Sequence, residues 1–109
     1  MTIASQQLHA AAVPVTTPVT IYTVPSGKRT ILKSIAVYNG WTSAQVVELY
    51  FYDGGTLLMA WPLYLGAIGT NADRILEAPW MVLLDGQIIK IVSDHSGAYA
   101  MLSGAELTV

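Results

Sequence analysis

The stretch VPSGKRTILKS concentrates positive charge, because Lys28, Arg29 and Lys33 are three of the five basic residues of the chain. Its Gly27-Lys28 pair also occurs in phosphate-binding loops, where backbone N–H groups and a lysine hold phosphate. Such a loop needs a glycine five residues earlier, a Ser or Thr after the lysine, and a following helix. Tyr22 and Arg29 occupy those two positions, and the residues that follow predict a strand. We therefore predict a hairpin corner whose three basic side chains contact an acidic neighbour.

Asp94, His95 and Ser96 are the three residue types of a hydrolase triad. Neighbouring residues of a strand point to opposite faces, so this run cannot form a triad, and Asp and Ser beside Gly97 predict a turn. His9 is too far from His95 in sequence to suggest a metal-ligand pair, and the acidic residues lack the spacing of a calcium loop. The chain has no cysteine. We expect no catalytic residue, no metal and no cofactor, and hence no enzyme.

Three tryptophans are candidates for binding or packing. Trp41 follows a predicted turn at Asn39-Gly40, and with Tyr50, Tyr52 or Tyr64 it is a candidate platform for stacking on a carbohydrate. Trp80 opens a predicted strand, so we expect it in the core, and we expect Trp61 in the core or an interface. Aromatic residues are enriched in ordinary protein interfaces, so a platform is one of two interpretations.

The composition indicates a protein that associates. Charged residues make up 11% of the 109 residues and apolar residues 53%, whereas about 25% charge is usual in a globular domain. A small domain with so few charges is expected to bury part of its surface against other copies or a partner. The net charge of −2 argues against binding to nucleic acid, which needs clustered Lys and Arg.

High hydropathy raises the question of a membrane span. No residue between Asp53 and Asp73 is charged, but four glycines and Pro62 interrupt that segment, and a spanning helix needs about 20 predominantly apolar residues. The N-terminus has no basic region followed by an apolar stretch, so we expect no signal peptide. Neither membrane insertion nor ordinary secretion is expected.

The spacing of turn residues from residue 19 onward is typical of an all-β domain. Alternating apolar residues between Gly-marked turns predict about eight strands, at 19–24, 29–39, 45–53, 56–65, 73–77, 80–84, 87–94 and 98–109. Pro62 predicts an edge position for its strand, and Gly104 predicts a bulge. We predict a single antiparallel β-sandwich of jelly-roll or related type over residues 19–109.

Residues 1–18 differ from the rest, with no charged side chain and with prolines at positions 14 and 18. Ile3 to Ala12 are compatible with a short helix that the prolines would end. We predict an N-terminal arm. It is either a solvent-exposed tail or a segment that orders against a neighbour, and the lack of charge favours the second.

The strands and turns resemble those of small β-sandwich virion proteins of tailed bacteriophages. The resemblance rests on IYTVPSGKRTILKSIAVYNG, then WMVLLDGQIIKIVSD, and the closing GAYAMLSGAEL, together within residues 19–107. Proteins similar to these decorate heads or form parts of tails and fibres, commonly as trimers. The resemblance implies a structural role and transfers no catalytic residue. The segment 54–72 matches no part of that pattern, so head or tail is not distinguished.

These observations predict a virion protein that decorates or cements the outer surface of the head. It would bind the major capsid protein or another virion protein as a homotrimer, partly through the arm. The surface expected to bind copies or a partner comprises Leu57, Leu58, Trp61, Leu63, Tyr64 and Ile68. The alternative is a tail-fibre or receptor- and carbohydrate-binding module, in which Trp41 would be exposed.

Overall fold

The computed structural model describes residues 6–69 and 72–108, except for the side chains of residues 73–80, and those residues form eight strands. The strands are β1 (Gln6–Ala12), β2 (Val19–Thr23), β3 (Lys28–Asn39), β4 (Gln45–Asp53), β5 (Thr56–Leu65), β6 (Asp73–Leu83), β7 (Ile88–Ser93) and β8 (Ala98–Thr108). Two four-stranded sheets result, sheet I in the order β1-β8-β3-β6 and sheet II in the order β2-β7-β4-β5. Every neighbouring pair of strands is antiparallel. The predicted all-β, antiparallel β-sandwich of about eight strands is confirmed.

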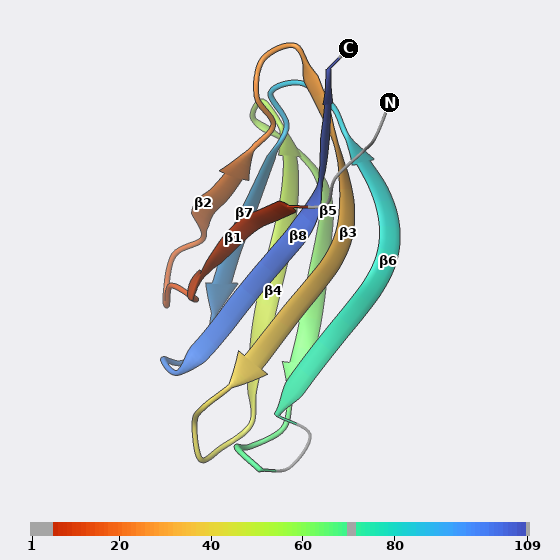
Figure 1. The fold of residues 1–109 in the computed structure, drawn as a ribbon. Coiled ribbons are helices and arrows are strands. Elements are labelled where there is room, and N and C mark those ends of the chain that lie inside the picture. Colours follow the sequence, from red (N-terminus) through yellow and green to blue (C-terminus); the bar gives the residue numbers. More distant parts are fainter. Residues whose placement is uncertain (1–5, 70–71, 109) are drawn as a thin grey trace.

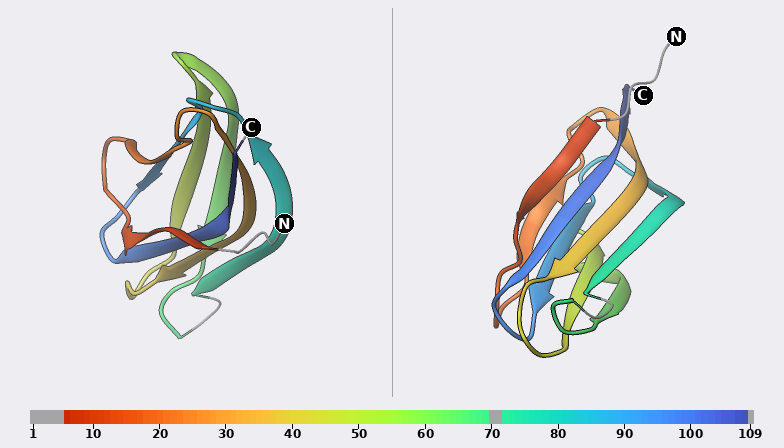
Figure 2. Two further views of the ribbon diagram at one scale, coloured as in Figure 1. Left: turned by 45° about the horizontal axis from the view of Figure 1, so that its top comes forward. Right: turned by 60° about the horizontal axis from the view of Figure 1, so that its bottom comes forward.

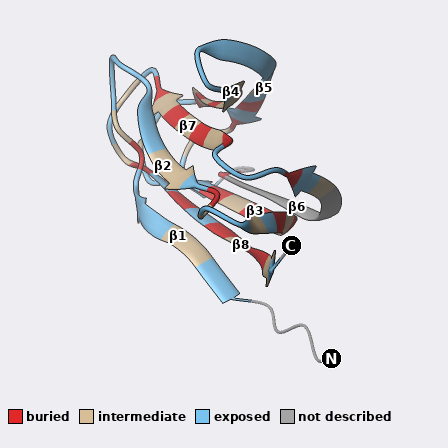
Figure 3. Ribbon diagram, turned by 90° about the horizontal axis from the view of Figure 1, so that it is seen from above, coloured by how far each residue is buried: buried red, intermediate tan, exposed pale blue. Residues whose placement is uncertain are grey.

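The core lies between the two sheets, and Figure 3 shows that strands of both sheets contribute buried residues. In β4 the residues Gln45, Val47, Leu49 and Phe51 are buried, as their alternation predicted. Their partners from sheet I include Leu32, Ile35 and Leu102, which are fully buried. Alternation with a period of two places these residues on one face of each strand, which is the pattern that a two-layer sandwich needs.

Two elements differ from the prediction. Residues 6–12 form a strand and not a helix, because β1 pairs with β8 along one edge of sheet I (Figure 2, right). Residues 73–77 and 80–84, predicted as two strands, belong to the continuous strand β6 through Pro79. The register of β6 against β3 is irregular beside Pro79, between the pairs Leu32–Met81 and Ser34–Glu77. An edge strand tolerates a proline at such an irregularity.

The bulge predicted at Gly104 lies in the strands on either side of β8. Leu8 is the extra residue in β1, opposite Ser103 and Leu102, and Lys33 is the extra residue in β3, opposite Gly104 and Ser103. A Cβ atom at Gly104 would lie 2.3 Å from the carbonyl oxygen of Ile31. The glycine is therefore required by the close approach of β3, which is a known use of glycine inside a sheet.

Turns and loops gather at the two ends of the sandwich. The turns after β2, β4 and β6 lie at one end, and the loops after β3, β5 and β7 lie at the other (Figure 1). The Asp53-Gly54-Gly55 turn joins β4 and β5 as a hairpin, as predicted, with a φ of +60° at Gly54. The turn at Gly27 joins β2 of sheet II to β3 of sheet I, so it is a corner between sheets and not a hairpin.

Candidate functional site

The basic corner between β2 and β3 binds a carboxylate of the chain itself. Gly27 has a φ of +75°, which its place in a tight turn requires, and the Lys28 N–H donates to the Pro25 carbonyl at 3.1 Å. The Gly27 N–H donates to Asp85 Oδ2 at 2.8 Å, and Asp85 lies in the turn between β6 and β7. The position that a phosphate would take is thus occupied by the Asp85 side chain of the same protein.

Two of the three basic residues surround this corner. A hollow of about 350 Å³ is lined by Lys28 and Arg29, together with Gly27, Leu84 and Asp85. Lys33 does not line it, because it lies at the irregularity of β3 and its side chain is half-buried. The structure therefore groups Lys28 and Arg29 around an acid of the same chain.

The opposite end of the sandwich contains the Asp94–Gly97 turn. Asp94 Oδ1 accepts from the Val46 N–H at 3.1 Å, and His95 Nδ1 lies 2.9 Å from the backbone oxygen of Ser96. Gly97 has a φ of +101°, as expected in a turn. These contacts involve backbone groups, so each side chain fixes the loop and no nucleophile–base pair forms.

Trp41 stacks on His95 in this loop end. The ring centroids are 3.5 Å apart and the ring planes differ by 5°. The backbone N–H of Trp41 donates to Asn39 Oδ1 at 2.9 Å, and the backbone carbonyl of Trp41 accepts from the Ile68 N–H at 2.8 Å. The half-buried indole has one face covered by the imidazole, so only the other face is available to stack on a sugar.

Asn39 organises these loops, a role that sequence reasoning did not assign to it. Its side chain is fully buried, and its Nδ2 donates to the carbonyls of Ser43 at 2.8 Å and Gly66 at 2.9 Å. Its Oδ1 accepts from Gln45 Nε2 at 2.7 Å as well as from the Trp41 N–H. One buried amide thus joins the loops after β3 and β5, and Gln45 extends the network to Ser96. From the sequence, Asn39 at the end of a predicted strand indicated only a turn.

The six residues predicted to bind copies or a partner do not form one surface. Leu57, Leu58, Tyr64 and Ile68 are exposed, Trp61 is half-buried and packs against the core, and Leu63 belongs to the core. Leu63 is 6% exposed and is therefore unavailable to a partner. Leu57 and Leu58 lie at one end of β5, whereas Tyr64 lies near the other end.

Leu58 belongs to an apolar surface at the open edge between β5 and β6, which we call the open-edge patch. It consists of Leu58, Met59, Val82 and Leu84, all of them exposed. These four residues line a hollow of about 280 Å³ with Phe51, Leu83, Met81 and Gln87. Leu58 is the extra residue where the pairing of β4 with β5 shifts register, so the hairpin carries apolar side chains on both faces.

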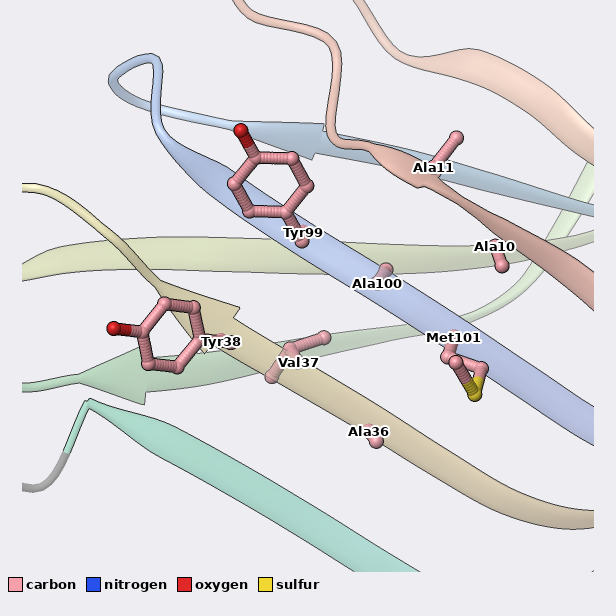
Figure 4. Close-up of a pocket in the computed structure, with 8 residues that line it drawn as sticks. All are labelled: Ala10, Ala11, Ala36, Val37, Tyr38, Tyr99, Ala100 and Met101. Carbon is pink, nitrogen blue, oxygen red and sulfur yellow. The ribbon is translucent and has the colours of Figure 1, made fainter.

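A second apolar surface covers the outer side of sheet I, and sequence reasoning missed it. We call it the apolar face; it consists of Ala10 of β1, Ala36 and Tyr38 of β3, and Tyr99 and Met101 of β8 (Figure 4). The paired residues Tyr38 and Tyr99 are 42% and 55% exposed, and Met101 is 50% exposed. Together with Ala11, Val37 and Ala100 they line a groove of about 520 Å³.

The outer side of sheet II has a different character. Glu48 accepts a hydrogen bond from the Tyr50 hydroxyl, and Lys90 Nζ lies 5.0 Å from the centre of the Tyr52 ring. These polar and charged groups are typical of a surface that faces water. The apolar face has no charged residue among its five, and its side-chain polar groups are the hydroxyls of Tyr38 and Tyr99. The two surfaces are therefore suited to different surroundings.

A polar network links both sheets near the strand ends. The Tyr22 hydroxyl donates to Glu106 Oε2 at 2.6 Å and lies 2.6 Å from Thr30 Oγ1. Gln6 Nε2 donates to Glu106 Oε1 at 3.0 Å, which attaches β1 to the same carboxylate. Burial, and then the hydrogen bond to Glu106, raise the pKa of Tyr22 to about 12, because both disfavour the phenolate.

Two kinds of feature are absent from the described residues. No group of three or more His, Asp or Glu side chains is placed to hold a metal ion in the part of the chain that the structure describes. Within the same residues, no helix is long and apolar enough to cross a membrane. The surfaces that stand out are the apolar face and the open-edge patch, and both are suited to contact with protein.

No protein-family model matches the chain, and no curated protein matches it. Two solved viral structures are similar in fold. The infectious bursal disease virus Gx strain structure has a TM-score of 0.53 at 13% identity, and the T13 viral particle of the same virus has 0.54 at 11%. Each match covers 96% of this chain, but it covers 31% of the Gx strain protein and 30% of the T13 particle protein. This chain therefore spans about a third of the length of either neighbour. At such identities the likeness shows the fold alone.

Proposed function

We propose that the chain is a non-enzymatic structural protein of a virus particle that decorates the assembled head as a homotrimer. The observation that carries the proposal is the pair of exposed apolar surfaces, the apolar face and the open-edge patch, on a sandwich with few charges. Exposed apolar patches rimmed by polar residues mark interaction sites in soluble proteins. A protein with two of them is suited to contact both its own copies and a partner.

The strand order supports a jelly roll. Antiparallel pairs join β1 to β8, β2 to β7, β3 to β6, and β4 to β5, which is the pattern of one long hairpin rolled into two sheets. Jelly rolls are frequent in viral capsid domains and also occur in lectins. The viral particles with a similar fold agree with the first of these uses.

The proposed mechanism is stabilisation by preferential binding. A protein that binds the assembled shell and not its free subunits shifts the equilibrium toward the shell. Three linked copies bind with an avidity that no single contact supplies, because the second and third contacts are intramolecular. We assign the open-edge patch to the partner in the shell and the apolar face to contacts between copies. The tailed-bacteriophage resemblance makes the major capsid protein the expected partner.

The carbohydrate-binding alternative receives less support. The imidazole of His95 covers one face of the Trp41 ring, and Trp41 is half-buried. A sugar platform needs a free ring face in a site with polar groups that orient the ligand. We therefore expect no glycan to be retained by the purified protein, and a glycan array provides the measurement.

Binding to emptied heads tests the proposed partner surface. Leu58→Asp places a charge in the open-edge patch, and we expect it to weaken co-sedimentation with heads at least tenfold. Val19→Asp is the matched control, because Val19 is equally exposed, at 48% against 51% for Leu58, but lies on the edge strand β2. Equal binding by both variants, or an equal loss in both, would remove the open-edge patch from the proposal.

A further inference from the structure

Residues 6–15 form backbone contacts with the sandwich along one edge, and Leu8 and Val13 pack against the core. β1 lies at the edge of sheet I and pairs with β8 alone, and none of its seven residues is fully buried. Beyond it, the Val13 N–H donates to the Ala98 carbonyl at 2.8 Å, and the Ser93 N–H donates to the Pro14 carbonyl at 2.9 Å. The segment thus docks on β8 and the end of β7 as a single strip (Figure 1).

The connection from this strip to β2 is short and strained. Only residues 16–18 separate the strip from Val19, where β2 begins. Thr16 has a φ of +82°, and among the non-glycine residues that the structure describes it alone has a positive φ. A β-branched residue in this region is a genuine outlier, because its side chain crowds the backbone. Pro14 and Pro18 flank it and stiffen the chain on either side.

We propose that residues 6–15 exchange between copies, so that β1 of one copy pairs with β8 of another. Exchange preserves every contact of the strip and changes only the conformation of residues 16–18. Thr16 then becomes free to adopt a negative φ, so the exchanged form loses the strain of the closed form. A short hinge under strain is the feature that favours such swapping, which is a low-cost route to oligomers.

The contacts specify a second copy of this chain as the source of the strip. Gln6 donates a hydrogen bond to Glu106, and the register of β1 against β8 pairs Ala10 with Met101 and Ala12 with Tyr99. The Leu8 side chain must also fit beside Gly104, where the space is tight: a Cβ added to Gly104 would lie 3.2 Å from Leu8 Cδ1. An unrelated strand would not reproduce this combination. Exchange would also build the apolar face from two copies, with Ala10 from one and Tyr99 and Met101 from the other (Figure 4).

Disulfide trapping tests the exchange, since the chain has no cysteine of its own. Ala10 and Met101 are directly paired, and Cα atoms of antiparallel partners are about 4.5–5.5 Å apart, within the range of a disulfide. Full-length Ala10→Cys and Met101→Cys proteins are unfolded together, refolded as a mixture and oxidised. Exchange predicts a disulfide-linked pair that contains one copy of each variant.

Ala36→Cys mixed with Met101→Cys is the matched control. Ala36 is also paired with Met101, but both strands of that pair lie outside the strip, so exchange adds no link in this mixture, whereas contact between two apolar faces would link both mixtures alike. Equal linking in both mixtures, or none in either, overturns the exchange. The inference rests on the oligomer in the proposed function, and light scattering separates the two: an oligomer without the link refutes the exchange alone, whereas a monomer refutes both.

The hinge gives an independent test. Thr16→Gly removes the strain of the closed form, so we expect the equilibrium to move toward monomer by roughly 5- to 30-fold per chain. Thr17→Gly adds the same backbone freedom without strain to relieve and is the control. Thr16→Pro forbids a positive φ and is expected to give oligomer only. If the three variants match the wild type in oligomer distribution, the strained hinge has no role and the exchange proposal fails.

Discussion

Gly104 lies where the backbone of β3 passes close to β8, and its replacement by alanine tests the packing of sheet I. The added Cβ would lie 2.3 Å from the Ile31 carbonyl oxygen and 3.2 Å from Leu8 Cδ1. Contacts below 3.0 Å essentially never occur for a real Cβ. The nearer atom belongs to the backbone of a central strand, so relief requires that β3 move away from β8.

The loss of stability follows from the need to move the backbone of β3. Overpacking a rigid core by one methyl group costs about 1–3 kcal/mol, and displacement of a backbone ladder places this site at the upper end. We expect Gly104→Ala to lower the free energy of unfolding by about 3 kcal/mol. With an unfolding entropy of about 2.1 cal/mol/K per residue over 109 residues, Tm falls by roughly 13 °C.

Denaturant and thermal unfolding at matched protein concentration measure this loss. Gly55→Ala is the control, because Gly55 lies in the β4–β5 turn, has no positive φ, and has no atom within 4 Å of an added Cβ. We expect it to change stability by less than about 0.5 kcal/mol. Equal stability of Gly104→Ala and Gly55→Ala would refute the close approach of β3 and the bulges that frame it.

Three further changes address the polar contacts. Asn39→Ala should cost about 3 kcal/mol in denaturant unfolding, because it leaves buried partners in two loops without their hydrogen bonds; a loss below about 1 kcal/mol would contradict the role of Asn39. Tyr22, with a pKa raised from 10.0 to about 12, binds its proton more tightly when folded. The stability that this shift contributes is therefore complete below pH 10 and is lost as the pH rises toward 12. It is absent in Tyr22→Phe. A titration of tyrosinate absorbance in which no tyrosine ionises near pH 12 would contradict this. His95→Ala should expose the Trp41 ring, shift its fluorescence to longer wavelength and cost about 1 kcal/mol; an unchanged spectrum would argue against the stack.

The sequence predicted the strands best where alternation and turn chemistry agree. The bounds of β4 and β5 are as predicted, because QVVELYFYD alternates cleanly and a Gly-Gly turn follows it. β1 was missed because QQLHAAA has good helix formers and no alternation, so only its pairing with β8 makes it a strand. The fusion of residues 73–83 was missed because Pro79 normally ends a strand, and its tolerance depends on an edge position that only the topology reveals.

The candidate surfaces were predicted less well, for reasons of register. Tyr38, Tyr99 and Met101 lie far apart in sequence, and only the pairing of β3 with β8 brings them to one face. Leu63 could have been assigned correctly, because Leu63 and Leu65 share one face of β5, whereas Tyr64 points to the other. The acid that binds at the Gly27 corner could not be identified from sequence, since Asp85 reaches the corner from a separate turn.

Co-sedimentation with emptied heads of the virus particle to which we propose the chain belongs tests the central proposal most directly. Purified full-length protein is titrated against heads, and the bound copies are counted at saturation. We predict saturable binding with a fixed multiple of three copies for each repeat of the shell, and heads that resist dissociation better when loaded. A folded protein that stays in the supernatant at every concentration, and is absent from purified particles, would contradict the proposed function.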